Sequence, residues 1–119
     1  MNEMALPHTV FCVLDTVARR TGFTVSDIIG MRRFGPLTCA RAAAAWTMMR
    51  HLEMTYVQIG FVLSGRDHST VVNMMQLMEG MISIGDPVCD VLRDINEALR
   101  PILSTYRNNQ CHEEKKLPL

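Results

Sequence analysis

The sequence lacks the closely spaced cysteines that build zinc sites or dense disulfide frameworks. Its four cysteines lie far apart and include no Cys-x-x-Cys pair, so we expect isolated thiols in a reducing compartment. No apolar run approaches the roughly 20 residues that a membrane span needs. No basic segment precedes an apolar stretch at the N-terminus, which argues against a signal peptide. These absences predict a cytoplasmic protein that does not enter a membrane.

A convergent set of catalytic side chains is also missing. His68 lies between Asp67 and Ser69, but neighbours on one helical turn point in different directions, whereas a catalytic triad needs side chains that converge. The four histidines lack metal-ligand spacing, and there is no glycine-rich phosphate loop. We therefore expect a protein that is not an enzyme and that holds neither a metal nor a cofactor.

The chain has no net charge, yet its charges are unevenly distributed. Residues 17–66 contain seven arginines against Asp27 and Glu53, a local charge of +5. Residues 1–16 carry −2, and residues 67–119 carry five basic and eight acidic side chains, or −3. Attraction to a phosphate backbone depends on the local field, so this asymmetry is compatible with nucleic-acid binding. By itself, it also fits an ordinary solvated surface.

The 119 residues suffice for one domain with a hydrophobic core but not for two. Apolar residues at helical spacing, together with capping residues, predict an all-α protein. The expected helices cover about residues 9–20, 25–31, 38–53, 56–63, 67–82 and 87–99. Pro101 is expected to end or kink the last helix, and the polar segment 108–119 is expected to be disordered.

Two of these helices form a predicted helix-turn-helix. Thr55 and Gln58 have capping-box spacing, and Ser64-Gly65 then breaks the first helix. In the second helix, one face is apolar and the opposite face is polar, as is the first turn. The apolar face consists of Val71, Met74, Met75, Met78 and Ile82. A polar first turn suits a recognition helix in the major groove, but the pattern fits a buried helix with a polar cap equally well.

The run Gly65-Arg66-Asp67-His68-Ser69-Thr70-Val71, preceded by Ile59-Gly60, resembles the signature of the C-terminal DNA-binding domain of the bacterial replication initiator DnaA. The resemblance extends upstream without a gap through Arg41, Arg32-Arg33 and the segment 25–29, so that it covers about residues 17–81. It implies a small helical bundle with a Trp-repressor-like helix-turn-helix that binds duplex DNA.

The resemblance also implies roles for individual residues. Four side chains of the recognition helix would read bases in the major groove: Asp67, His68, Ser69 and Thr70. In the basic loop that contains Arg32, Arg33 would enter the minor groove, where a narrow A·T-rich groove attracts arginine. Arg41 and Arg66 would contact phosphates. Asn73, one turn further along the helix, is our own addition. The chain departs from the family at Phe34-Gly35-Pro36, which replaces basic residues, and at Ala42, which replaces a glutamine.

Three functions follow as hypotheses. The first is a sequence-specific double-stranded DNA-binding protein that recognises DnaA-box-like sites and regulates transcription or replication initiation, associated with the nucleoid. The second is a protein-interaction module on the same fold that binds the replication initiator or RNA polymerase. The third is a ligand-gated repressor, for which the sequence shows no ligand pocket. DnaA hydrolyses ATP through a separate domain that this sequence does not contain, so ATP binding is not implied.

The predicted domain organisation has three parts. Residues 1–85 form the DnaA-like DNA-binding domain, and residues 108–119 form a disordered tail. Between them, residues 86–107 add a helix that either packs on the domain or serves as the face of a homodimer; the sequence leaves both open.

Overall fold

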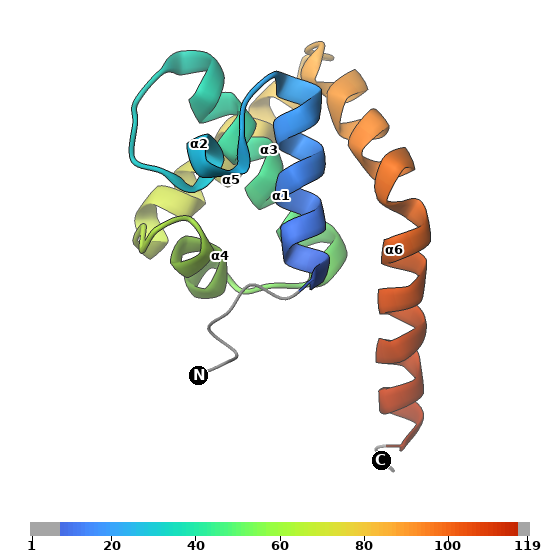
Figure 1. The fold of residues 1–119 in the computed structure, drawn as a ribbon. Helices are drawn as coiled ribbons and strands as arrows, with labels where there is room; N and C mark the ends of the chain where they lie inside the picture. Colours follow the sequence, from blue (N-terminus) through green and yellow to red (C-terminus); the bar gives the residue numbers. More distant parts are fainter. Residues whose placement is uncertain (1–7, 117–119) are drawn as a thin grey trace.

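In the computed structural model, the backbone of residues 8–116 and the side chains of residues 8–102 are described. The backbone folds into helices joined by short turns (Figure 1). The helices are α1 (His8–Thr21), α2 (Val25–Ile29), α3 (Gly35–Leu52), α4 (Tyr56–Val62), α5 (His68–Ser83) and α6 (Val88–Lys116). No strand occurs among the described residues. The all-α fold predicted from the sequence is therefore confirmed.

Two short helices begin with capping boxes that the sequence encodes locally. The Thr24 hydroxyl accepts a hydrogen bond from the Asp27 N–H at 3.0 Å, and the Asp27 carboxylate accepts one from the Thr24 N–H at 3.1 Å. Thr55 and Gln58 repeat this exchange at the start of α4, at 3.1 and 2.9 Å. Reciprocal capping satisfies backbone donors that a helix start would otherwise leave unpaired. It therefore defines where α2 and α4 begin.

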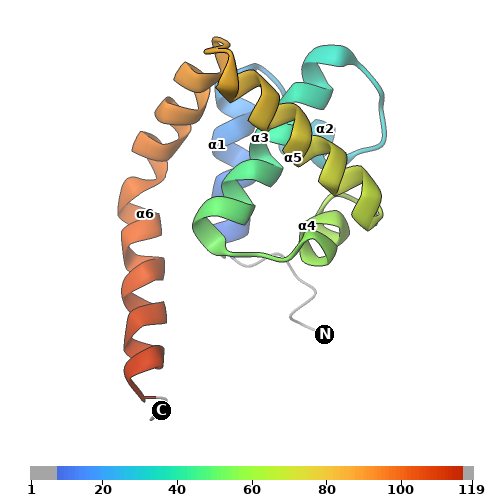
Figure 2. The ribbon, with the colours of Figure 1, turned by 180° about the vertical axis from the view of Figure 1, so that it is seen from behind.

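Helix α3 forms the centre of the core. The run Ala42–Ala45 is buried, and α1, α5 and α6 all pack against α3. Alanine favours helix and adds little bulk, so neighbouring helices can approach closely. Seen from behind, α5 lies across α3 and runs from the turn after α4 to the turn before α6 (Figure 2). Trp46 is partly buried and packs against this core.

The last helix closes the core on the side of α1. Asp86 caps it by accepting a hydrogen bond from the Val88 N–H at 2.8 Å, and Ile95 and Leu99 are fully buried against the domain. Arg20 of α1 and Asp94 of α6 form an ion pair at 3.8 Å. The first part of α6, as far as Leu99, therefore belongs to the same core as the helix-turn-helix.

Of the two outcomes expected at Pro101, an end or a kink, the structure excludes the end, and the expected disordered tail also differs from the structure. Pro101 lies inside α6, whose backbone stays helical to Lys116, so the expectation is corrected for residues 108–116. The helix is already nucleated by the packing of Ile95 and Leu99, and glutamate, lysine and glutamine extend it because they are strong helix formers. Residues 117–119 lie outside the described residues. Within the part that is described, no helix is long and apolar enough to cross a membrane.

Candidate nucleic-acid interface

The turn between α4 and α5 depends on a close backbone approach. Ser64 and Gly65 have φ angles of 67° and 77°, and the Arg66 N–H donates to the Gly60 carbonyl at 2.9 Å. A Cβ atom at Gly60 would lie 2.1 Å from the Arg66 carbonyl oxygen. Only glycine fits there, so Gly60 sets how closely the turn folds back on α4.

The N-terminus of α5 is capped by Asp67. Its Oδ1 atom accepts a hydrogen bond from the Thr70 N–H at 3.1 Å and another from the Thr70 hydroxyl at 2.8 Å. The hydrogen bonds from the Thr70 hydroxyl and N–H hold the pKa of the Asp67 carboxyl below its usual value. Two of the four residues that the resemblance assigns to base reading are therefore bonded to each other in the free protein.

The two faces of α5 are arranged as the sequence predicts. Val71, Met74, Met75 and Met78 are buried, and Ile82 is half-buried. On the opposite side, His68, Ser69 and Asn73 are exposed. The polar face of α5 therefore extends beyond the first turn.

Three side chains from other elements converge on the C-terminal end of α2. The Nε and Nη2 atoms of Arg41 donate to the carbonyls of Ile28 and Asp27 at 2.8 and 3.0 Å. The Ser64 hydroxyl donates to the Ile29 carbonyl, and the Nη2 atom of Arg66 donates to the Gly30 carbonyl at 2.7 Å. The last carbonyls of a helix have no partner within it and carry its negative dipole end, which favours cationic donors. These bonds attach α2, and the basic loop after it, to α3 and to the turn before α5.

The two arginines of this set are therefore less available to a ligand than the sequence suggested. Arg41, expected to contact phosphate, is only 3% exposed, and Arg66 also donates to the Leu63 carbonyl at 2.6 Å. Burial lowers the pKa of Arg41, and the nearby charges of Arg66 and Arg32 lower it further. The pKa of Arg66 is lowered by burial and then by the charge of Arg33. These guanidinium groups lie close enough to repel one another.

The basic loop between α2 and α3 presents Arg32 and Arg33 at the surface. Arg32 lies over the ring of Phe34, 5.7 Å from its centroid, and Phe34 makes an edge-to-face contact with Phe23 at 6.3 Å. Phe34 thus orders the loop through aromatic and cation–π contacts. Arg33 has no such contact with Phe34, and it faces Arg66 instead.

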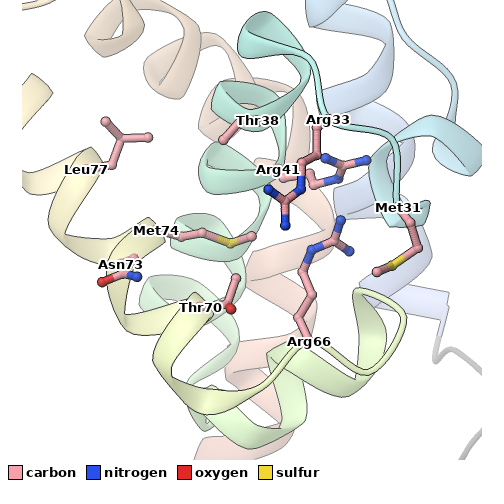
Figure 3. Close-up of a pocket in the computed structure, with 9 residues that line it drawn as sticks. All are labelled: Met31, Arg33, Thr38, Arg41, Arg66, Thr70, Asn73, Met74 and Leu77. Carbon is pink, nitrogen blue, oxygen red and sulfur yellow. The ribbon is translucent and has the colours of Figure 1, made fainter.

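A hollow of about 400 Å³ lies between the basic loop, α3 and α5, and the guanidinium groups of Arg33, Arg41 and Arg66 point toward one another in it (Figure 3). Its lining consists of Met31, Arg33, Thr38, Arg41, Arg66, Thr70, Asn73, Met74 and Leu77. Five of our nine candidate residues line this hollow, while Arg32, Asp67, His68 and Ser69 lie outside its lining.

Sequence reasoning missed Met31, Thr38, Met74 and Leu77 as lining residues. Leu77 could have been found, because it follows Thr70 and Asn73 at helical spacing on α5. Nothing in the local sequence marks Thr38 or Met31. Within the described side chains, no group of three metal-binding residues lies close together, and Cys12, Cys39 and Cys89 are free thiols.

A model of the family described as "Bacterial dnaA protein helix-turn-helix" matches residues 11–77, more than half of the chain. The chain belongs to this family. The match runs from Phe11 in α1 to Leu77 in α5, and therefore includes the turn, the first part of the recognition helix and the basic loop. The resemblance inferred from the signature is thereby confirmed.

Several full-length members are similar to the chain. It is 28% identical to chromosomal replication initiator protein DnaA 1 of Chlamydia trachomatis over 96 residues, which is 81% of this chain and 21% of that protein. It is 33% identical to DnaA of Mycoplasma capricolum over 70 residues, 59% of this chain and 16% of that protein. The chain thus spans about a fifth of these curated relatives or less. No solved structure matches it significantly.

The Asp67 cap predicts a dependence of stability on pH. Folding lowers the pKa of the Asp67 carboxyl. The charged carboxylate therefore stabilises the fold fully at any pH above the pKa of the unfolded state, about 3.9. This stabilisation is lost as the pH falls through the lower pKa of the folded state. Asp67→Asn keeps a good N-cap that does not titrate. We expect the stability of the wild type, relative to Asp67→Asn, to fall between pH 5 and pH 3. Urea denaturation measures this difference in the free energy of unfolding, and Glu79→Gln is a charge-matched control on α5. A difference that is constant over this range would contradict the prediction.

Proposed function

We propose that this chain binds double-stranded DNA sequence-specifically at DnaA-box-like sites and so regulates transcription or replication initiation. On this proposal it is a non-enzymatic, cytoplasmic protein that works on the nucleoid. One observation carries the proposal: three guanidinium groups meet in a hollow directly beside the exposed polar face of a helix-turn-helix recognition helix. The family membership supports it, since the matched relatives are chromosomal replication initiator proteins.

The cationic hollow suits a DNA phosphate. Arg41 and Arg66 repel each other, as do Arg66 and Arg33, and the negative charge that acts on Arg41 is that of the partly buried Asp27. A phosphate placed among these groups would offset that repulsion and accept charge-assisted hydrogen bonds. Arg41 would contribute through its Nη1 atom, because its Nε and Nη2 atoms already donate to α2.

The exposed face of α5 suits the major groove. When α5 enters the groove with its N-terminus, His68, Ser69 and Thr70 meet base edges, and Asn73 meets the flanking backbone or base. Thr70 offers a methyl group to thymine, while Asp67 can accept from a cytosine amino group. Arg33, with Arg32 beside it, would extend from the basic loop into the adjacent minor groove.

A titration of fluorescence anisotropy tests the proposal. One duplex carries a DnaA-type box, a second carries the same bases in scrambled order, and both are measured at two salt concentrations. We expect a preference of about 10³ or more for the box. Weak, equal and salt-sensitive binding to both duplexes would mean that only the phosphate attraction operates, and would reject sequence-specific recognition.

Thr70→Ala is expected to weaken binding to the box by about 1–3 kcal/mol and to change binding to the scrambled duplex little. The variant removes both the methyl group and the hydroxyl that the reading helix offers to a base. Gln76→Ala, an exposed substitution further along α5, is the matched control and should leave both affinities unchanged. An equal loss on both duplexes would contradict a base-reading role.

The alternative of a protein-interaction module, in which an acidic C-terminal half binds the initiator or RNA polymerase, has less support. The acidic side chains described on α6 form ion pairs with arginines of the chain itself: Asp90 with Arg93 at 2.9 Å, Glu97 with Arg100 at 3.0 Å, and Asp94 with Arg20 at 3.8 Å. This surface is therefore largely neutralised. A homodimer through α6 stays a proposal whose test is the oligomeric state in solution.

A further inference from the structure

Two aromatic rings meet at the start of the recognition helix. The imidazole of His68 and the ring of Tyr56 lie 5.5 Å apart, centroid to centroid, with their planes tilted by 56°. This separation is within the range of favourable aromatic pairs. Tyr56 is half-buried and packs against the hydrophobic core, whereas His68 is exposed. The half-buried ring of Tyr56 is thus the support, and the exposed ring of His68 is the group that a ligand can reach.

Both rings are carried by helix starts whose backbone is held in place. Tyr56 is the first residue of α4, directly after the Thr55–Gln58 capping box. His68 is the first residue of α5, directly after the Asp67 cap. The hydrogen bond from the Arg66 N–H to the Gly60 carbonyl holds the two helices in register. The helix-turn-helix geometry therefore places the two rings beside each other.

We propose that Tyr56 is a specificity-determining positioning residue that holds the imidazole of His68 in the orientation in which it meets a base edge. The inference rests on the proposed function and extends it to a residue outside the recognition helix. Imidazole nitrogens donate or accept hydrogen bonds according to the tautomer, so the direction of the ring decides which base groups it can address. A histidine without this support would have to be ordered when DNA binds, and that ordering reduces the discrimination it can provide.

A double-mutant cycle tests the proposal, with the ratio of the scrambled-duplex Kd to the box Kd as the readout. We expect Tyr56→Leu, which keeps an apolar side chain on the core, to lower this ratio about three- to tenfold. Tyr56→Phe keeps the ring and should retain the ratio. His68→Ala should lower the ratio at least as much as Tyr56→Leu does. The double variant should lose no more than His68→Ala alone.

Phe61→Leu removes an exposed ring elsewhere on α4 and serves as the matched control, with no change expected. In the free protein, the proton resonances of the His68 imidazole should shift when the Tyr56 ring is removed, and thermal unfolding shows whether Tyr56→Leu stays folded. If the wild type has no preference for the box, the proposed function and this inference fail together. If the preference is present but the losses at Tyr56 and His68 multiply, or Tyr56→Leu has no effect, the inference alone is overturned.

Discussion

Gly60→Ala is expected to abolish the folded helix-turn-helix. The added Cβ atom would lie 2.1 Å from the Arg66 carbonyl oxygen and 3.4 Å from a methyl group of Val71. The first contact is with backbone, which cannot rotate away, and the Gly60 carbonyl itself accepts the Arg66 N–H. Relief therefore requires α4 and the turn to separate. We expect a loss of roughly 3 kcal/mol or more in the free energy of unfolding, measured by urea denaturation, and loss of box binding.

Gly80→Ala provides the control within the same domain. Gly80 lies inside α5, is exposed, and has no atom within 4 Å of the position where a Cβ would be added. Alanine is the better helix former, so this substitution should raise stability by about 0.5–1 kcal/mol. If both substitutions had small effects, the close approach at Gly60 would be ruled out as the determinant of the turn.

Arg41→Met is expected to destabilise the protein by roughly 2–4 kcal/mol, while Arg33→Met should change stability by less than about 0.5 kcal/mol. Methionine keeps the apolar stem of Arg41 but removes the two hydrogen bonds to the carbonyls of Asp27 and Ile28. The Asp27 carbonyl would still accept the Gly30 N–H at 3.2 Å, but the carbonyl of the buried Ile28 would lose the Arg41 donor, which is costly. The relief of repulsion between Arg41 and its neighbouring arginines offsets part of that cost. Arg33 is exposed, so its replacement should not leave a buried acceptor without a donor.

The two variants should also be compared on DNA. Arg33→Met should weaken binding to the box and reduce the dependence of log Kd on log salt concentration by about one unit, because one cationic contact is lost. Since that variant is expected to be as stable as the wild type, a loss of affinity would report a direct contact with DNA. We infer that Arg41 stabilises the fold and that Arg33 does not. An equal loss of stability in both variants, or no loss in Arg41→Met, would contradict this inference.

The local features of this fold could be predicted from the sequence. The capping boxes at Thr24 and Thr55 join residues three positions apart, and the apolar face of α5 repeats within one helix. Such signals depend on neighbours within about one turn, which the sequence displays directly. The signature after Gly60 is likewise a continuous run, and it led to the family that the comparison confirms.

The extent of α6 could not be predicted in the same way. Pro101 and the polar residues after it suggested an end, because proline removes a backbone donor and clashes with the preceding turn. The cost of one proline is offset when the helix is anchored elsewhere, and here Ile95 and Leu99 are buried against the domain. Whether a helix is anchored depends on the other helices that pack against it, and a local sequence pattern does not contain that information.

The sequence by itself determined the all-α class, the helix-turn-helix, the exposed face of α5 and the family. The tertiary structure alone decided what the arginines do: Arg41 reaches a carbonyl 13 residues away, and Arg66 reaches one 36 residues away. It also decided that the rings of Tyr56 and His68 lie beside each other, and that Arg33, Arg41 and Arg66 share one hollow. The physical reason is that a long polar side chain bonds to whichever acceptor the packing of other helices places within its reach.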